Sequence, residues 1–265
     1  MNTDRPSPIL DVRGFSCAIG GKSIVRDVTF SVQRGESVAI IGPNGAGKTT
    51  LLKCIDGILP GVGGEIQIDG RPIADYSRKE LAKRISYVPQ ADGYTLPFTV
   101  EQFVQMARYP YLSPFHPVGR DQIEVVRQVM EQTDISQFAD RVLDTLSGGE
   151  RQTVFLAAAV AQESPIMLLD EPTAFLDYRH QDEIRQLLAE IAGQSDLTTV
   201  CVTHDVNRAA MENDRVIALR EGQIVFDGQP EALMNEATLE SIYACRFMLI
   251  DRPDIPLPMV VPLKH

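Results

Sequence analysis

A glycine-rich stretch between an apolar run and a helical run constrains this chain more than any other feature. Residues 38–53 read VAIIGPNGAGKTTLLK, and their middle fits the pattern G-x-x-x-x-G-K-[ST]. The apolar residues before the pattern predict a buried parallel strand, and the residues from Thr49 predict the opening of a helix. The alternative is a plain glycine-rich turn, but average residue usage makes a chance match roughly a one per cent event. The stretch therefore predicts a binding site for a nucleoside triphosphate.

The residue types of this loop predict its contacts. Glycines let successive N–H groups curl toward a phosphate, and the helix N-terminus adds partial positive charge. Lys48 can reach the β- and γ-phosphates, and the Thr49 hydroxyl suits Mg²⁺. The expected nucleotide contacts are Gly42, Pro43, Asn44, Gly45, Ala46, Gly47, Lys48, Thr49 and Thr50.

Composition narrows the class of protein. The chain has 265 residues and a formal charge of −11. Its contents of 44% hydrophobic and 23% charged residues are ordinary for a soluble globular protein. The acidic balance disfavours DNA wrapping or unaided adhesion to an anionic membrane, since both need a basic face. The four cysteines form no C-x-x-C pair, which disfavours a metal or redox site, and Cys54 and Cys201 lie in apolar runs, so we expect these two in the core. No stretch approaches the roughly 18 apolar residues of a membrane span, so we expect a cytosolic chain or one held at a membrane by a partner.

The periodicity of the chain predicts an α/β domain with two additions. Residues 9–19 and 23–32 alternate around Gly20 and Gly21, which predicts an antiparallel hairpin. Residues 91–146 show helical spacing and no evident strand, which predicts an inserted, mainly helical subdomain. Alternation of helix and strand then returns, and the Pro-rich end from Arg252 is expected to be an extended, packed tail. We predict one domain over 1–265, with 91–146 helical and 246–265 a C-terminal tail.

Two acidic residues follow a second apolar strand. Residues 166–171 read IMLLDE, so Asp170 is placed to hold Mg²⁺ and Glu171 to orient or deprotonate an attacking water. The alternative is a pair of exposed acids at a strand end, which is common when such a pair occurs alone. Its occurrence after a phosphate loop in the same chain favours the catalytic interpretation.

The segment 146–150, LSGGE, decides the family. Ser147 suits a helix N-cap, and Gly148 and Gly149 expose N–H groups at the positive end of a helix dipole. Alone this would be an ordinary cap, but it lies about 20 residues before the acidic strand end. It resembles the signature motif of ATP-binding cassette (ABC) ATPases. The other motifs of that family also match, with Gln90 at the Q-loop, 174–177 at the D-loop and His204 at the switch histidine.

The resemblance implies a phosphate-loop NTPase core of ABC type, working as a head-to-tail homodimer that sandwiches two ATP molecules. The signature residues Ser147, Gly148 and Gly149, with Asp177, would then face the partner's nucleotide. It implies that Gln90 senses Mg²⁺ and the transport partner, and that His204 contacts the γ-phosphate. The implied catalytic residues are Glu171, His204, Gln90 and Lys48, and the implied Mg²⁺ ligands are Thr49, Gln90 and Asp170.

The chain departs from the family pattern at the adenine. The family usually places an aromatic residue shortly before Gly21, and Ile19 aligns with it here. Phe15 lies nearby at a different spacing, so the base could be covered by Ile19, by Phe15 or by neither. The D-loop also carries Ala174 and Phe175 where Ser-Ala is usual.

The middle segment narrows the resemblance further. Residues 99–103 and 108–111 look like those of importer ATPases for ferric siderophores, haem and cobalamin, as do 176–181 and 205–210. We therefore expect the ATPase subunit of a metal-chelate importer at the cytoplasmic face of the inner membrane. Its expected partners are a second copy, two permease subunits and, indirectly, a substrate-binding protein, with no nucleic acid. The alternatives are an importer of another metal or solute, an exporter, or a soluble ABC protein, which a single cassette and an acidic pI disfavour.

Overall fold

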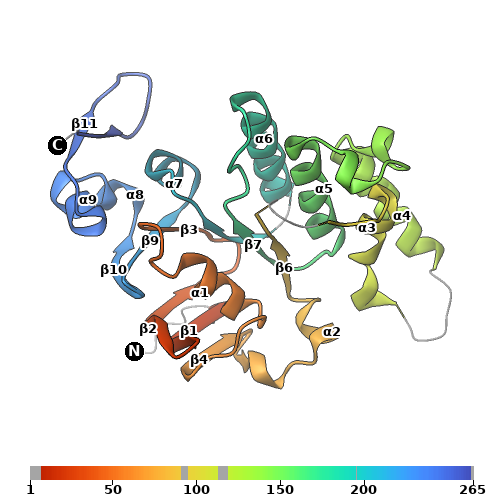
Figure 1. Cartoon of the computed structure of the whole chain (residues 1–265), viewed down its shortest axis with the longest axis horizontal. Helices are drawn as coiled ribbons and strands as arrows, with labels where there is room; N and C mark the ends of the chain where they lie inside the picture. Colours follow the sequence, from red (N-terminus) through yellow and green to blue (C-terminus); the bar gives the residue numbers. More distant parts are fainter. Residues whose placement is uncertain (1–6, 91–94, 113–118, 195, 264–265) are drawn as a thin grey trace. The chain divides into compact units, whose positions relative to one another are not determined.

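The computed structural model describes residues 7–90, 95–112, 119–194 and 196–263, and the chain divides into two compact units (Figure 1). The first unit comprises residues 1–75 and 198–265, and the second unit comprises residues 76–197. Within the described ranges, none of the helices combines the length and apolar content that a membrane span requires.

An antiparallel sheet opens the first unit. Strand β1 (Leu10–Ile19) pairs with β2 (Lys22–Val32) from Leu10 opposite Val32 to Ile19 opposite Lys22. Gly20 and Gly21 form the turn at φ of 57° and 79°, a region that glycine adopts without steric cost. Strands β4 (Gly63–Ile68) and β5 (Arg71–Pro72) complete the order β2-β1-β4-β5, and η1 (Ile73–Asp75) follows. The hairpin predicted from the sequence is confirmed.

Parallel strands form the buried centre of the first unit. Strand β3 (Ser37–Ile41) lies between β8 (Thr198–Val202) and β9 (Arg215–Arg220) and runs parallel to both. Strand β10 (Gln223–Gly228) extends this sheet antiparallel to β9. Residues 38–41 are each 0% exposed, which explains their continuous apolar run, because both faces of the strand are covered. The buried parallel strand predicted before the glycine-rich loop is confirmed.

The first unit contains the helices α1 (Lys48–Ile55), α7 (Val206–Glu212), α8 (Pro230–Leu233) and α9 (Glu236–Tyr243). The predicted extended tail contains a hairpin of β11 (Phe247–Ile250) and β12 (Met259–Pro262). Asn207 fixes it, because its Nδ2 donates to the Val260 carbonyl at 3.1 Å and its Oδ1 accepts from the Val260 N–H at 2.7 Å. Val260 thereby joins an apolar cluster with Leu233 and Phe247.

The second unit combines a strand pair with helices. Strands β6 (Ile85–Val88) and β7 (Ile166–Asp170) are parallel, with Val88 opposite Leu169. Helix α5 (Gly148–Ala161) is largely buried, and α2 (Arg78–Leu81) and α6 (Tyr178–Gln194) belong to the same unit. The side-chain amide of Gln162, the C-cap residue of α5, donates to the carbonyls of Ala82 and Ile85 at 2.6 Å each. This one side chain ties the end of α5 to the start of β6.

Helices dominate the described part of residues 95–146. They are α3 (Val100–Met106), η2 (Tyr109–Tyr111), α4 (Arg120–Gln132), η3 (Ser136–Phe138) and η4 (Leu143–Thr145). The β pairing described in this segment is one isolated bridge, Thr99 with Val142. Arg108, only 2% exposed, anchors the segment, since its Nε donates to Gln122 at 2.8 Å and its Nη1 to Glu163 at 2.7 Å.

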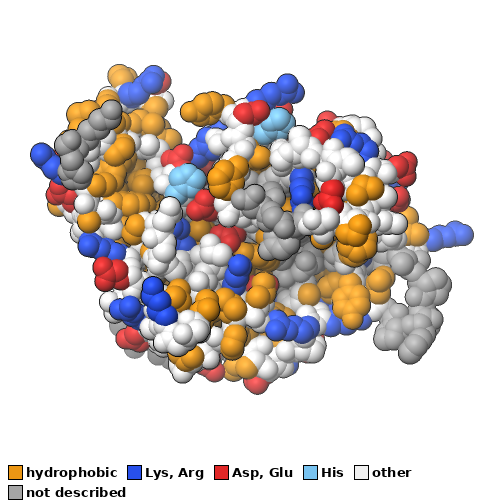
Figure 2. Space-filling view, in the orientation of Figure 1, with side chains coloured by type: hydrophobic (Ala, Val, Ile, Leu, Met, Phe, Trp, Pro, Cys, Tyr) orange, Lys and Arg blue, Asp and Glu red, His pale blue; other side chains and the backbone are white. Residues whose placement is uncertain are grey.

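Charged side chains of both signs are interspersed on the face shown in Figure 2. Arg34 contacts Asp69 at 2.9 Å in the first unit, and Arg127 contacts Glu131 at 2.6 Å in the second. All four of these side chains are at least 30% exposed, so each pair stabilises the fold only weakly.

Candidate functional site

The glycine-rich loop joins β3 to α1 in the first unit, and its path is set by neighbouring backbone. Gly42, Gly45 and Gly47 have φ of 139°, 78° and 101°, values that side-chain-bearing residues rarely adopt. A Cβ at Gly42 would lie 2.0 Å from the Leu219 carbonyl oxygen, and one at Gly47 would lie 2.9 Å from the Ile24 carbonyl oxygen. Glycine is therefore required at these positions before any ligand is considered.

Lys48 is the first residue of α1 and is 7% exposed. Its Nζ donates to the carbonyl of Gly42 at 2.8 Å and to that of Pro43 at 3.2 Å, so the ammonium group lies against the loop. Thr49 and Thr50 follow in the first turn of α1, which contains no acidic residue. A curled backbone, a helix N-terminus, a lysine and a hydroxyl together suit a polyphosphate with its Mg²⁺.

His204 lies at the same sheet edge as this loop. Strands β3 and β8 are parallel and paired, with Ile40 opposite Val202, so their carboxyl ends meet at one edge. The Thr203 N–H donates to the Ile40 carbonyl at 3.2 Å, which holds the chain against β3 as it leaves β8. The next residue, His204, is exposed, and Asp205 begins α7 by accepting from the Arg208 N–H. The structure thus brings two predicted site elements of the first unit together.

Burial distinguishes the two residues that could cover the adenine base. Phe15 is 4% exposed, and a Cβ at Gly61 would lie 2.5 Å from its ring, so Phe15 is packed into the sheet and cannot stack on a base. Ile19, at the end of β1, is 48% exposed. Of the two residues, only Ile19 is exposed enough to contact the base.

The acidic strand end is in the second unit. Asp170 ends β7 and is only 4% exposed, and the Tyr87 hydroxyl donates to its Oδ2 at 2.9 Å. Glu171 follows at φ 50°, in the left-handed region, so the chain turns sharply after the strand. Because β6 and β7 are parallel, Gln90, two residues beyond β6, lies at the same edge as both carboxylates. Tyr87 was missed by the sequence analysis, and no local pattern marks it.

Ser147 begins α5 with a reciprocal cap. Its Oγ accepts from the Glu150 N–H at 3.3 Å, and its own N–H donates to Glu150 Oε2 at 2.7 Å. The backbone N–H and hydroxyl of Ser147 hold the pKa of Glu150 below its usual range. Gly148, at the first position of this 14-residue helix, is exposed, whereas Gly149 is buried. The predicted N-cap is confirmed.

Asp177 caps α6 at the end of the predicted D-loop. Its Oδ1 accepts from the backbone N–H of His180 and contacts Nδ1 of the same residue, each at 2.9 Å. These two bonds hold the pKa of Asp177 below its usual range. Gln181 also donates to the Leu176 carbonyl at 3.0 Å. Phe175, at φ 62°, is 82% exposed.

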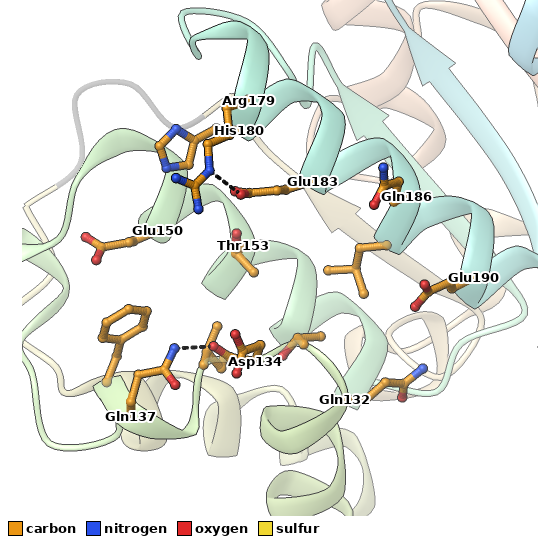
Figure 3. Close-up of a pocket in the computed structure, with 14 residues that line it drawn as sticks. Gln132, Asp134, Gln137, Glu150, Thr153, Arg179, His180, Glu183, Gln186 and Glu190 are labelled. Atoms are coloured by element: carbon orange, nitrogen blue, oxygen red, sulfur yellow. Dashed lines mark hydrogen bonds and ion pairs between the residues drawn. The ribbon is translucent and has the colours of Figure 1, made fainter.

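A cavity of about 470 Å³ lies beside these residues in the second unit (Figure 3). It is bounded by the end of α4 and η3 on one side and by α5 and α6 on the other. Glu150 and His180 reach it from the starts of α5 and α6. His180 was given no role from the sequence.

Comparisons with known proteins identify the family. The sequence profile described as ABC transporter matches residues 25–174. The ferric enterobactin transport ATP-binding protein FepC of Escherichia coli K12 is 39% identical over 254 residues, covering 95% of this chain and 94% of the relative. The hemin import ATP-binding protein HmuV of Streptomyces coelicolor is 38% identical over 253 residues, covering 94% and 88%.

A solved structure shows the same fold. A protein described as a metal-chelate type ABC transporter in an inward-facing conformation superposes with a TM-score of 0.83 and 25% identity, covering 97% of this chain and 98% of the other. The family resemblance and the fold class predicted from the motifs are confirmed. With the family profile matched over more than half of its length and 39% identity to a relative over nearly all of it, the chain belongs to the ABC transporter family and is an ATP-hydrolysing ABC ATPase.

Proposed function

We propose that this chain is the ATP-hydrolysing subunit of a membrane importer for a metal chelate, namely a ferric siderophore, haem or cobalamin. The observation that carries the proposal is the near full-length identity to importer subunits for ferric enterobactin and hemin. The segments 99–103 and 108–111, which motivated the same prediction, form the start of α3 with its capping residue Thr99 and η2 with Arg108 before it.

The roles proposed for the site residues follow from their chemistry. The loop at 42–50 would hold the phosphates of ATP, with Lys48 facing their negative charge. Mg²⁺ would be held by Thr49, Gln90 and Asp170, and it would neutralise charge on the phosphates. Glu171 would orient or deprotonate the attacking water, and His204 would contact the γ-phosphate. Ile19 would cover one face of adenine without an aromatic stack.

The proposed working unit is a head-to-tail homodimer at the cytoplasmic face of the inner membrane, beneath two permease subunits. The capped α5 supports this arrangement, because Gly148 and Gly149 place backbone N–H groups at the positive end of the helix in a chain with one phosphate loop. Asp177 would belong to the same shared site. A substrate-binding protein would deliver the chelate to the permease, so the chelate would not contact this chain.

Uptake in cells tests the proposal. A strain lacking this gene is complemented with the native chain or with Glu171→Gln, and accumulation of ferric siderophore, haem and cobalamin is measured. Native chain, but not Glu171→Gln, should restore uptake of one chelate. Equal accumulation of all three in both strains would refute a chelate importer, and ATP-dependent efflux would identify an exporter. Co-sedimentation with ribosomes or DNA in place of a permease would favour a soluble ABC protein.

A further inference from the structure

The imidazole of His180 lies between the signature segment and the D-loop of the same chain. A Cβ built at Gly149 would lie 2.3 Å from Cδ2 of His180, 2.6 Å from Cγ and 3.0 Å from Nε2. The same ring contacts Asp177 Oδ1 through Nδ1 at 2.9 Å. Figure 3 shows His180 in the first turn of α6, among the residues that line the cavity beside α5.

The contact with Asp177 identifies Nδ1 of His180 as a donor. An ionised carboxylate only accepts, and the backbone N–H of His180 favours the ionised form of Asp177, so Nδ1 carries a proton and donates. The Cδ2 and Cγ atoms of the ring lie against Gly149 so closely that a Cβ at this position would require the ring or the helix start to move. Gly149 is buried and Gly148 is exposed, so the ring supports the inner side of the segment whose outer side offers N–H groups.

The D-loop is held by the same first turn of α6. Asp177 accepts from the His180 backbone N–H as well as from its ring, and Gln181 donates to the Leu176 carbonyl at 3.0 Å. A Cβ at Gly148 would lie 3.9 Å from Leu176 Cδ2, in ordinary contact. The loop that begins at Glu171 and the start of α5 therefore share one support.

We infer that His180 is a positioning residue that sets the start of α5 and the D-loop in the one arrangement that accepts the partner's nucleotide. This inference rests on the proposed head-to-tail dimer. In that dimer, His180 would not touch the reacting atoms. Its role is to keep Gly149 and Asp177 in register, so that dimer formation does not require either segment to be ordered first.

Replacement by amides separates the hydrogen bond from the bulk of the ring. In His180→Asn the side-chain amide can take the place of Nδ1, whereas in His180→Gln it reaches the place of Nε2, and His180→Ala removes both. Asp177 is 68% exposed, so solvent compensates in part, and we expect losses of about five- to tenfold rather than the larger effect of a buried bond. Arg179→Ala is the matched control, because Arg179 is the preceding residue, is 85% exposed and contacts Glu183.

The assay is ATP-dependent dimerisation of the full chain carrying Glu171→Gln, measured by light scattering against ATP concentration, with ATP affinity of the monomer measured separately. His180→Ala and His180→Gln should raise the ATP concentration needed for dimerisation about five- to tenfold, with monomer affinity within twofold. His180→Asn keeps the bond to Asp177 but not the ring atoms nearest Gly149, so its loss should be smaller than that of His180→Ala and His180→Gln. Arg179→Ala should dimerise like the parent. Equal dimerisation by all variants, or His180→Asn no better than His180→Gln, would overturn the inference. Failure of the parent itself to dimerise would instead refute the proposed dimer.

A stability measurement tests the contact without reference to the dimer. Gly149→Ala should lower the melting temperature of the monomer because its methyl group meets the ring at 2.3 Å. His180→Ala in the same chain should restore most of the loss. A Gly149→Ala chain as stable as the parent, or one that His180→Ala fails to restore, would contradict the packing on which the inference depends.

Discussion

Tyr87→Phe removes one hydroxyl group from the environment of Asp170 and leaves the ring in place. The hydroxyl donates to Asp170 Oδ2 at 2.9 Å, and the carboxylate is 4% exposed. A hydrogen bond to a charged group contributes about 1.5–3 kcal/mol, and a buried carboxylate regains little of this from water. The bond also orients the carboxylate, so its loss lets Asp170 turn away from the position in which it would hold Mg²⁺ in the proposed site.

The magnitude follows from that range. If Tyr87→Phe must orient the Asp170 carboxylate anew when Mg²⁺ binds, a cost of about 1.5–3 kcal/mol lowers the affinity for Mg²⁺ roughly 10- to 100-fold. Loss of a residue that hydrogen-bonds to a metal ligand commonly costs about 10- to 100-fold in metal affinity, which agrees. The binding of ATP without Mg²⁺ should change little, because Tyr87 lies in β6 and not in the phosphate loop.

The assay is a Mg²⁺ titration of nucleotide binding to the full-length chain, followed with a fluorescent ATP analogue. The Mg²⁺ midpoint should rise at least tenfold in Tyr87→Phe. Tyr109→Phe is the control, since it removes the same hydroxyl from a ring that is 66% exposed. An unchanged midpoint in Tyr87→Phe, or an equal rise in Tyr109→Phe, would refute the role of this bond.

Four further predictions concern the site and the core. Glu171→Gln should bind ATP but lower turnover in the assembled transporter by about 10²–10⁴-fold, and activity within threefold of native would sink its assignment as the base. Dimers that combine Lys48→Ala in one chain with Ser147→Arg in the other should form nucleotide sandwiches better than either uniform mutant, because both lesions fall in one site. Ile19→Tyr should tighten ATP a few-fold and CTP less, since aromatic stacking adds about 0.5–1.5 kcal/mol; equal titrations before and after would contradict it. Burial raises the pKa of Cys54, so the native chain should resist iodoacetamide there until it is denatured, as mass spectrometry of labelled peptides can show.

The local features of the fold were predictable because they are encoded in adjacent residues. The hairpin at 10–32 follows from alternation around two glycines, and the buried strand β3 from a run of apolar residues. The glycine-rich loop is recognisable because its backbone needs glycine at fixed places, as the contact of Gly42 with the Leu219 carbonyl shows. These requirements act over a few residues and leave a direct trace in the sequence.

The contacts that refine the site were not predictable, because they join residues far apart in the chain. Tyr87 meets Asp170 across 83 positions, and its strand would read the same with the hydroxyl pointing elsewhere. Phe15 could be excluded from the adenine only by its packing against Gly61. The C-terminal hairpin depends on Asn207, 53 positions before Val260, and no pattern in the Pro-rich tail predicts this contact with Asn207.

Capping boxes show where local pattern stops short of function. Three helices of the second unit begin with the same reciprocal cap, formed by Ser77 with Glu80, Thr99 with Gln102, and Ser147 with Glu150. The cap alone therefore marks a helix start and not an anion site. What differs is the first turn, because α2 and α3 begin with bulky side chains, whereas α5 begins with two glycines that leave its N–H groups open. The second of these glycines, Gly149, is moreover covered by the ring of His180, and this contact distinguishes the third cap from the two that only begin a helix.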